Sequence, residues 1–564
     1  MDNNKKKTYN IVIMAITTYL SKLNFQKKAV IVIIFLAFII RIAGISYGLP
    51  LWLIDDEPPF VLGAIKMIQL RALIPAFHQS EFEKILYYPP YLSYLYIIPF
   101  IGIIGFQYLL HYKLGDLFIP FLVSDLSQFF MTARFIMTIV SLISIFLIYK
   151  IGKNLFFSEK IGAVAAFLLS TSLLHIMLSI TSRHWLTVSF FGLLIFFFLS
   201  SPKYESNKKY LIASAVAGIG MGFSAIIIAY LALIALWYLF AEKYPVPKMN
   251  ILACVILFSI MAAFPLLLYP QSLGFTRDVT TGAPKTLTGI IVSPFLFLKP
   301  IALSEPILAF FAAIGLLALL FYRRSVFIFF FTLIYGYSAL FYIAFRFEHR
   351  FVAGLLPFIA LLAAYGFNKI SELLPKKSAY ALLIIPLIFS TQLSRVIANN
   401  DSRMAARNWI EKNIPTHEKI LVYARLTRLS SDPTAIEEQR AIDNGSLRKV
   451  DEAEKALSPD NRNTPIFHAL NLYSVNNEQF FNNISEYAEK NNYKYALISD
   501  EDFTWERKDF SIMQKFGKSG TLIKTFGSYQ PEYSISTTQL SGSPLKLFKF
   551  SEFGPPLSLY KIPK

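Results

Sequence analysis

Long apolar runs dominate the first two-thirds of the chain. Runs of about 20 residues recur from Ala29 to Ser394 with short polar loops between them, and a helix of about that length crosses the hydrocarbon core of a bilayer. The composition agrees, because only 16% of the residues are charged, against about 25% in a typical soluble domain. The pattern therefore predicts a polytopic α-helical membrane protein and excludes a soluble one.

The predicted membrane spans are the apolar runs themselves, about 11–12 in number. We expect them at 29–47, 131–149, 161–180, 185–199, 211–240 with a break near 224, 251–268, 301–322, 326–345, 351–367 and 379–394. The apolar segment 91–112 is also long enough to span. A span there would move every later basic loop to the outer side, so we expect this segment to lie in the interface or to re-enter the membrane.

Basic residues set the predicted orientation. The formal net charge is +18, but Lys and Arg gather in short loops on one side of the spans, which is the positive-inside pattern and gives no sign of nucleic-acid binding. Residues 1–28 are then a cytoplasmic N-terminal segment and 29–395 the transmembrane domain, in which 48–130 and 269–300 are large extracytoplasmic loops. The single cysteine, Cys254, excludes an intrachain disulfide.

After Arg395 the sequence becomes polar. The stretch DSRMAARNWIEKNIP is typical of a helix, and five later stretches carry the β-branched and aromatic residues of strands: EKILVYA, YKYALISD, TLIKTF, LKLFKF and LSLYKI. Residues 396–564 are therefore expected to form a soluble α/β domain. By the parity of the spans, this domain lies on the extracytoplasmic side.

Three carboxylates stand in a row just after the first span, in the stretch LIDDEPPF. Two prolines follow and favour the start of a helix at Pro58, so Asp56 and Glu57 are expected at a helix N-terminus, where the dipole favours an ionised carboxylate. An ionised carboxylate can take a proton from a hydroxyl or bind a divalent cation. The alternative is a helix cap beside ordinary loop charge, and Asp55 has no assigned role beyond a possible place in a substrate groove.

Aromatic and basic side chains gather in other outer loops. Tyr88 and Tyr91 in YYPPY could line a sugar or lipid groove, or anchor the chain in the interface. Two basic patches, TSRHWL and FRFEHRF, run against the positive-inside trend and indicate an anionic ligand such as a lipid-linked phosphate. The alternative is that these residues snorkel at the membrane surface. The patches supply Arg183, His184, His349 and Arg350.

No nucleotide-binding loop, dinucleotide turn or metal-finger spacing occurs in the chain, so energy for a reaction would come from an activated substrate or a gradient. The predicted spans carry few ionisable residues. Because ion-coupled transporters usually show intramembrane charges, this argues against such a transporter.

In order and spacing, these features resemble the GT-C glycosyltransferases. The resemblance is to family 39 in particular, which holds the protein mannosyltransferases and their bacterial lipid A aminoarabinose transferase relatives. It is carried by the acidic pair followed by YYPPYLSYL, by MTARFIMTIVSLISIFLIYKIGKNLFF, by HRFVAGLLPFIALLAAYGF, by DSRMAARNWIEKNIP and by FGPPLSLYKI. It covers nearly the whole chain and favours an interfacial helix at 91–112.

The resemblance implies an inverting transfer of a sugar from a polyprenyl-phosphate donor to a hydroxyl of a lipid, an envelope glycan or a protein. The reaction would take place on the extracytoplasmic face of the inner or plasma membrane. The family's acidic pair matches Asp56 and Glu57, and its leading Asp, the base, matches Asp56. The leaving phosphate would be stabilised by Arg183, His184, His349 and Arg350.

The chain departs from the family at one place. Many relatives have an Asp in the patch that matches SRHWLTVSFF, where this chain has Thr187 and Ser189. Asp55 or Glu83 could replace it, and participation of a divalent metal stays open. Two other functions also stay open. One is a carrier or flippase-like binder of lipid-linked sugars. The other is a polysaccharide polymerase or ligase that uses the 269–300 loop, where contact candidates are Arg277, Asp278 and Lys285.

Overall fold

The computed structural model describes residues 24–204, 206–242, 248–273, 285–344, 348–443, 445, 448–462, 464–500, 508–528, 530, 532–549 and 551–563. The chain forms two compact units that interleave in sequence. The first unit holds the residues up to Ile42, Tyr87–Leu92 and Ile136–Thr391. The second holds Ala43–Leu86, Ser93–Phe135 and the chain from Gln392 onward.

Helices make up the described part of the first unit, and they follow most of the predicted spans. Their bounds are α2 Phe25–Ile42, α7 Ser127–Phe156 (which begins in the second unit), α8 Glu159–Thr171, α9 Leu173–Ser179, α10 Trp185–Ser200, α11 Ser206–Met221, η3 Ala225–Ala229, α12 Tyr230–Phe240, α13 Lys248–Leu268, η4 Pro270–Leu273, α15 Leu287–Ser304, α16 Pro306–Tyr322, α17 Arg324–Ala344, η5 His349–Gly354, α18 Leu356–Leu373, α19 Lys376–Ala381 and α20 Ile384–Ala398 (which ends in the second unit).

Six helices in the described part of the chain are long and apolar enough to cross a membrane, or eight if each of two bent pairs counts as one span. Three shorter apolar helices, α10, α16 and the stretch from η3 through α12, accompany them. The chain is therefore an integral membrane protein, as predicted. The segment 91–112 lies within a helical stretch, Tyr91–Ser124, that also meets the length and composition of a span. Its interfacial placement stays a prediction.

Two predicted boundaries are wrong. The loop expected at 269–300 contains α15, an apolar helix over Leu287–Ser304 that tolerates Pro294 and Pro300 within it. Prolines disfavour helices in water, but apolar membrane helices accept them because neighbouring groups satisfy the freed backbone. The span expected at 301–322 is interrupted at Glu305, where α15 ends and α16 begins with Pro306. The predicted break near Ser224 is confirmed, because α11 ends at Met221 and η3 starts at Ala225.

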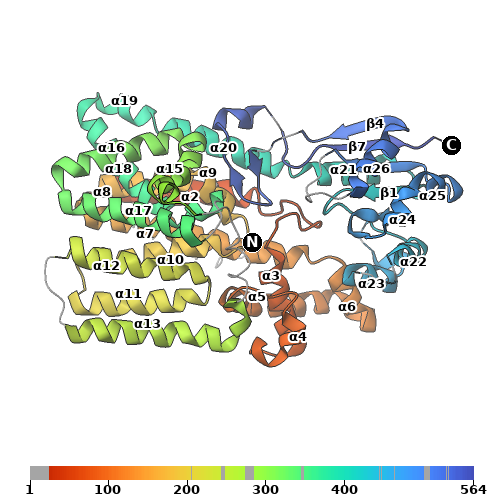
Figure 1. Cartoon of the computed structure of the whole chain (residues 1–564), viewed down its shortest axis with the longest axis horizontal. Coiled ribbons are helices and arrows are strands. Elements are labelled where there is room, and N and C mark those ends of the chain that lie inside the picture. Colours follow the sequence, from red (N-terminus) through yellow and green to blue (C-terminus); the bar gives the residue numbers. More distant parts are fainter. Residues whose placement is uncertain are drawn as a thin grey trace, which may run out of the picture. The chain divides into compact units, whose positions relative to one another are not determined.

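Close helix packing holds the first unit together. The helices α10, α11, α12 and α13 lie side by side (Figure 1), and α16 packs along α18. At the α16–α18 crossing, a Cβ atom added to Gly315 would collide with the carbonyl oxygen of Leu362, and one added to Gly366 with that of Phe311. Small residues let membrane helices approach until their backbones touch, which is how such helices gain packing energy without a hydrophobic driving force.

The second unit contains a five-stranded sheet of order β2-β1-β3-β7-β4. Its strands are β1 Lys419–Tyr423, β2 His468–Asn471, β3 Tyr495–Ser499, β4 Thr521–Phe526 and β7 Leu557–Lys561. The first three run parallel, and β7 runs antiparallel to β3 and β4. Side chains of β1 alternate between two cores: Leu421 and Tyr423 enter one, Ile420 and Val422 the other. Helices therefore cover both faces of the sheet.

The helices of the sheet region are α21 Ser402–Asn413, α22 Pro433–Ile442, α23 Lys449–Ala456, α24 Glu478–Asn482, α25 Ile484–Lys490 and α26 Lys508–Lys518, with the short strand pair β5 Tyr533–Ser534 and β6 Gln539–Leu540. The predicted helix after Arg395 and four of the five predicted strands are confirmed. The fifth, LKLFKF, is wrong, because this stretch forms the 3-10 helix η8, Pro544–Phe548. Pro544 starts the turn, and the N–H of Lys546 bonds to the carbonyl of Ser543.

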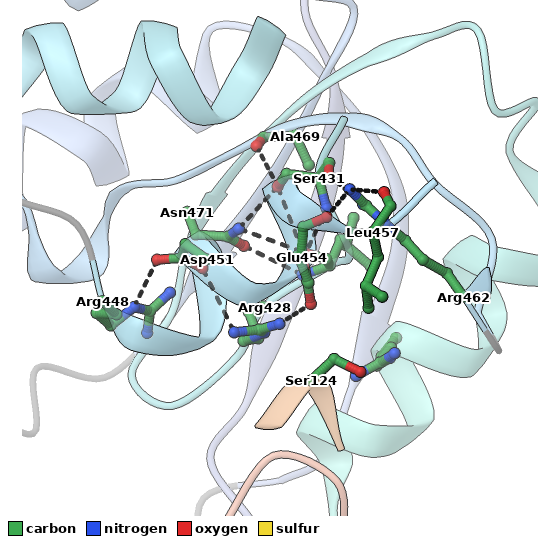
Figure 2. A network of polar contacts seen from close by, with 12 residues as sticks. Ser124, Arg428, Ser431, Arg448, Asp451, Glu454, Leu457, Arg462, Ala469 and Asn471 are labelled. Atoms are coloured by element: carbon green, nitrogen blue, oxygen red, sulfur yellow. Dashed lines mark hydrogen bonds and ion pairs between the residues drawn. The ribbon is translucent and has the colours of Figure 1, made fainter. Parts of the chain in front are cut away.

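The second unit also contains the helices that follow the acidic stretch. They are α3 Pro58–Leu70, η1 Pro75–His78, α4 Gln79–Phe82, α5 Tyr91–His111 (its first two residues belong to the first unit), η2 Tyr112–Leu117 and α6 Phe118–Ser124. The helix α6 packs on α23, which a polar network holds in place. Figure 2 shows Ser124 beside this network, in which Arg428 bonds to Asp451 and Glu454 of α23. Burial lowers the pKa of Arg428 to about 10.

Candidate functional site

Glu57 is the anchor of the acidic stretch. It is the N-cap of α3, and both its oxygens accept hydrogen bonds from Arg134 of α7, at 2.8 Å from Nε and 2.6 Å from Nη2. Both side chains are fully buried. The remaining nitrogen of Arg134 donates to the backbone carbonyls of Ile45 and Tyr47, at 2.9 and 2.7 Å. Paired, charge-assisted bonds of this kind are geometrically specific, so Glu57 fixes the chain on both sides of the stretch.

Further contacts hold the loop that leads into the acidic stretch. Asp55 accepts a bond of 3.0 Å from Arg425, which follows β1, and both side chains are partly exposed. The hydroxyl of Tyr47 donates to Asp401 at 2.5 Å, and Arg403 bonds to the same carboxylate. The loop is therefore tied to the start of α21 and to the end of β1.

An apolar cluster completes these restraints. Leu51 and Leu53 pack with Met404 and Leu426, and the ring of Trp52 stacks on Phe130 with 5.4 Å between centroids. Polar bonds and apolar packing thus act on the same short loop.

Asp56 lies between the two arginine-bonded acids and has a left-handed backbone, with φ of 59°. Trp52, four residues earlier, is also left-handed, with φ of 56°. The left-handed region costs an ordinary L-residue roughly 1–2 kcal/mol, and such conformations persist where surrounding contacts over-determine them, often at functional sites. Asp56 is half-buried and directly precedes the N-cap of α3, where the helix dipole favours its ionised form.

The structure brings together residues from three predicted loops around Trp185, in the first unit. The ring of His184 lies 4.6 Å from that of Trp185 and 4.7 Å from that of Tyr88. The guanidinium of Arg350 lies over Trp185, 5.7 Å from its centroid, and Phe351 packs on the same ring at 5.0 Å. We name Tyr88, His184, Trp185 and Arg350 the Trp185 cluster.

Two arginines near the Trp185 cluster have different surroundings. Arg350 forms an ion pair of 2.5 Å with Glu348, and Arg183 is fully buried in the loop between α9 and α10. Burial lowers the pKa of His349, although Glu348 acts in the opposite direction. Burial thus disfavours the positively charged form of His349, so its ring is better suited to hydrogen bonding than to supplying a positive charge.

The other predicted groove residues lie elsewhere. Tyr91 donates its backbone N–H to the carbonyl of Gly222 at 2.9 Å and packs edge-on against Phe223, so it anchors the start of α5 to the turn after α11. Arg277 and its neighbour Asp278 lie outside the described residues.

Sequence reasoning missed two buried arginines. Arg134 completes the acidic stretch, and Arg41 of α2 bonds to Ser141, to the carbonyl of Ser170 and to His175 at 2.8, 3.1 and 2.9 Å. The available signal was a lone arginine inside an otherwise apolar run, since ionisable residues in spans are costly and usually have a specific partner.

No metal site is evident at the acidic stretch. Across the described residues, no three His, Cys, Asp or Glu side chains gather in a way that could hold a metal ion. At the stretch itself, two of the three carboxylates bond to arginines. These residues alone therefore do not fit a protein-held divalent cation.

Comparison with known families supports the resemblance. The model of the dolichyl-phosphate-mannose-protein mannosyltransferase family matches residues 118–269. The resemblance to family 39 of the GT-C glycosyltransferases is thereby confirmed over this segment. The matching family consists of glycosyltransferases, which is the enzyme class predicted from the sequence. No curated protein matches the chain.

Solved structures of glycosyltransferases overlap this chain partially. The oligosaccharyltransferase of Archaeoglobus fulgidus in its apo form is 16% identical over 90% of this chain and 74% of that one, with a TM-score of 0.43. ArnT from Cupriavidus metallidurans, bound to undecaprenyl phosphate, is 10% identical over 84% and 93%, with a TM-score of 0.43. The mycobacterial arabinofuranosyltransferase AftD is 11% identical over 77% and 34%, with a TM-score of 0.31. At these values the overlap carries no conclusion about function.

Proposed function

We propose that the protein is an inverting glycosyltransferase that moves a sugar from a polyprenyl-phosphate donor to a hydroxyl of a lipid, an envelope glycan or a protein. The reaction takes place on the extracytoplasmic face of the membrane. The observation that carries the proposal is the backbone of Asp56, held left-handed between Asp55 and Glu57, each of which bonds to its own arginine. The family match over 118–269 supports the reaction class.

Asp56 acts as the general base. Its carboxylate accepts the proton of the acceptor hydroxyl while that oxygen attacks the anomeric carbon of the donor sugar. The bond between the anomeric carbon and the phosphate oxygen breaks, and the electron pair leaves with the polyprenyl phosphate. A single displacement of this kind inverts the configuration at the anomeric carbon. Glu57 is a positioning residue in this scheme, because its oxygens bond to Arg134.

The leaving polyprenyl phosphate gains negative charge as the sugar departs, so cationic or hydrogen-bonding groups must stabilise it. Arg183 and Arg350 would supply charge, and Arg350 is suited to paired bonds with phosphate oxygens. His184 and His349 would donate hydrogen bonds. Tyr88, which packs on His184, would line the path of the sugar or the lipid.

The test is a transfer assay in membranes with radiolabelled polyprenyl-phosphate sugars. The Asp56→Asn protein is compared with wild type and with Asp55→Asn, a matched loss of one neighbouring carboxylate. We expect Asp56→Asn to lose transfer by about 100-fold or more, the scale of a lost general base, and Asp55→Asn to retain it. Normal transfer by Asp56→Asn would overturn the assignment of the base. Donor binding without transfer from any donor would favour the carrier function instead.

A further inference from the structure

The stretch LKLFKF, residues 545–550, is predicted as a strand, whereas Pro544–Phe548 forms a short 3-10 helix that presents apolar side chains outward. We name residues 544–549 the foot. Leu545 is 65% exposed and Phe548 51% exposed, while Leu547 points inward and is fully buried. Lys549 is exposed at the end of the helix. Large apolar residues and a lysine thus share one outward surface.

Hydrogen bonds fix the foot beside the last apolar helix of the chain. The side chain of Gln392 donates to the carbonyl of Leu547 at 2.9 Å. Just beyond the foot, the side chain of Asn399 donates to the carbonyl of Ser551, also at 2.9 Å. Gln392 belongs to α20, whose candidate span is Ser378–Ala398. Both bonds lie within the second unit, so they place the foot along the final turns of that span.

The level of Gln392 in the membrane follows from the sequence of α20. The helix is apolar up to Phe389. After that residue, Ser390, Thr391, Gln392, Ser394 and Arg395 alternate with the apolar Leu393, Val396, Ile397 and Ala398. Gln392 precedes the end of the span at Ala398 by six residues, or about 9 Å of helix. The interfacial layer on each side of a bilayer is about 5–8 Å thick. Since about 9 Å is slightly more than this thickness, the foot lies near the boundary between the lipid headgroups and the acyl chains.

We propose that the foot is a lipid-contacting element, which inserts Leu545 and Phe548 into the interface and rests the sheet region on the bilayer. Leucine and phenylalanine flanked by lysine is the composition of interfacial segments. Lys549 reaches toward the headgroups as a snorkelling cation, and Lys546 is held by an ion pair of 2.5 Å with Glu532. The foot thus contacts a lipid surface, and its hydrogen bond with α20 places it beside the end of the last candidate span.

The experiment uses the full-length protein in phosphatidylcholine vesicles, with Cys254 replaced by serine so that one new cysteine can be labelled. Leu545→Cys carries a polarity-sensitive dye, and lipids with a nitroxide near the headgroup serve as the quencher. The matched control is Leu522→Cys. Leu522 is 51% exposed on β4 and lies four residues before Phe526, the last residue of that strand, which is about 13 Å along the strand. Both positions are exposed, so neither cysteine should disturb the fold.

We expect a blue-shifted dye at position 545 that loses about half of its emission to the nitroxide lipids, since interfacial side chains insert about 5–10 Å. The dye at position 522 should keep its emission. Adding Phe548→Glu to the Leu545→Cys chain should reverse most of the quenching. Equal behaviour at both positions would overturn the proposal. A blue shift at 545 without lipid quenching would also overturn it, because a protein surface would then cover the foot.

Discussion

Glu57 and Arg134 form two parallel hydrogen bonds, of 2.8 and 2.6 Å, across 77 residues of sequence. Neither side chain is exposed to solvent. Two adjacent acids, which the sequence places together before one helix, therefore have different environments in the fold. Glu57 is buried and bonded to Arg134, whereas Asp56 next to it has a left-handed backbone just before α3.

Removing one partner of this pair should be costly. Glu57→Ala leaves the guanidinium of Arg134 buried without its counter-charge, which we expect to lower the free energy of unfolding by about 3–5 kcal/mol. Replacing both residues by Met should recover much of that loss, since apolar residues of similar volume often substitute well for a buried ion pair. Thermal unfolding in detergent micelles measures both. Equal destabilisation by the single and the double change would contradict this account.

The neighbouring pair should behave differently. Asp55 and Arg425 are 3.0 Å apart and partly exposed, and pairs of this kind contribute about 0–1 kcal/mol. We therefore expect Asp55→Asn and Arg425→Gln each to change the melting temperature only slightly and to leave sugar transfer within about twofold of wild type. A severe loss of transfer in Asp55→Asn, with stability intact, would show that Asp55 belongs to the reacting site.

Local sequence predicted much of the fold. Apolar length located most spans, the prolines after Glu57 predicted the start of α3, and β-branched and aromatic composition predicted β1, β3, β4 and β7. The failures came where tertiary contacts decide the conformation. LKLFKF has the composition of a strand, but Pro544 and the bond from Gln392 make it a 3-10 helix beside α20. The break at Glu305 lay inside a run that was apolar apart from Ser304, Glu305 and Pro306.

The candidate site was predicted only in part. The acids and the basic loops stood out because charge is rare in this chain. Their pairing did not, since the partners Arg134 and Arg425 lie far from the acids in sequence. The convergence of Tyr88, His184 and Arg350 on Trp185 depends on how three loops pack. No periodicity in the sequence encodes that packing.

A hydrogen-bonded cluster around Glu438 in the sheet region should make the free energy of unfolding fall in acid. Glu438 accepts bonds from Tyr487, Tyr493 and His468, at 2.5, 2.8 and 2.8 Å. Burial would raise the pKa of Glu438, but these bonds outweigh it and hold the pKa below the usual 4.5. The unfolded chain then binds the proton more readily, so the stabilisation is present above about pH 4.5 and is lost as the pH falls through the folded-state pKa.

The check is the melting temperature of wild type and Glu438→Gln between about pH 3 and pH 7, the range that spans an ordinary carboxyl titration. Wild type should lose stability steeply at the acid end. The variant should start lower and change less, because its amide does not titrate. Glu437→Gln is the matched control, since Glu437 bonds to exposed Lys455 at the surface. Parallel curves for wild type and Glu438→Gln would argue against this cluster as the acid-sensitive element.

Helix packing in the first unit gives a steric prediction. A Cβ atom at Gly366 of α18 would meet the backbone of α16, whereas one at Gly336 of α17 would meet nothing within 4 Å. Gly366→Ala should therefore lower the free energy of unfolding by about 1–3 kcal/mol, as overpacking does. Gly336→Ala should be neutral or stabilise by up to about 1 kcal/mol, because alanine is the better helix former. Similar values for the two variants would contradict the close α16–α18 crossing.

The Trp185 cluster gives the most direct test of donor binding. Arg350 lies over Trp185 and forms an ion pair with Glu348, so its guanidinium is oriented before a donor arrives. If it bonds to the donor phosphate, Arg350→Gln should raise the KM for a polyprenyl-phosphate sugar by about tenfold or more, the value of one or two charge-assisted bonds. Arg350→Lys should raise the KM less than Arg350→Gln but still above wild type, because lysine keeps the charge but loses the paired geometry. The control is Arg324→Gln, at the exposed start of α17. An unchanged KM in Arg350→Gln with a lower kcat would move Arg350 from donor binding to stabilisation of the transition state.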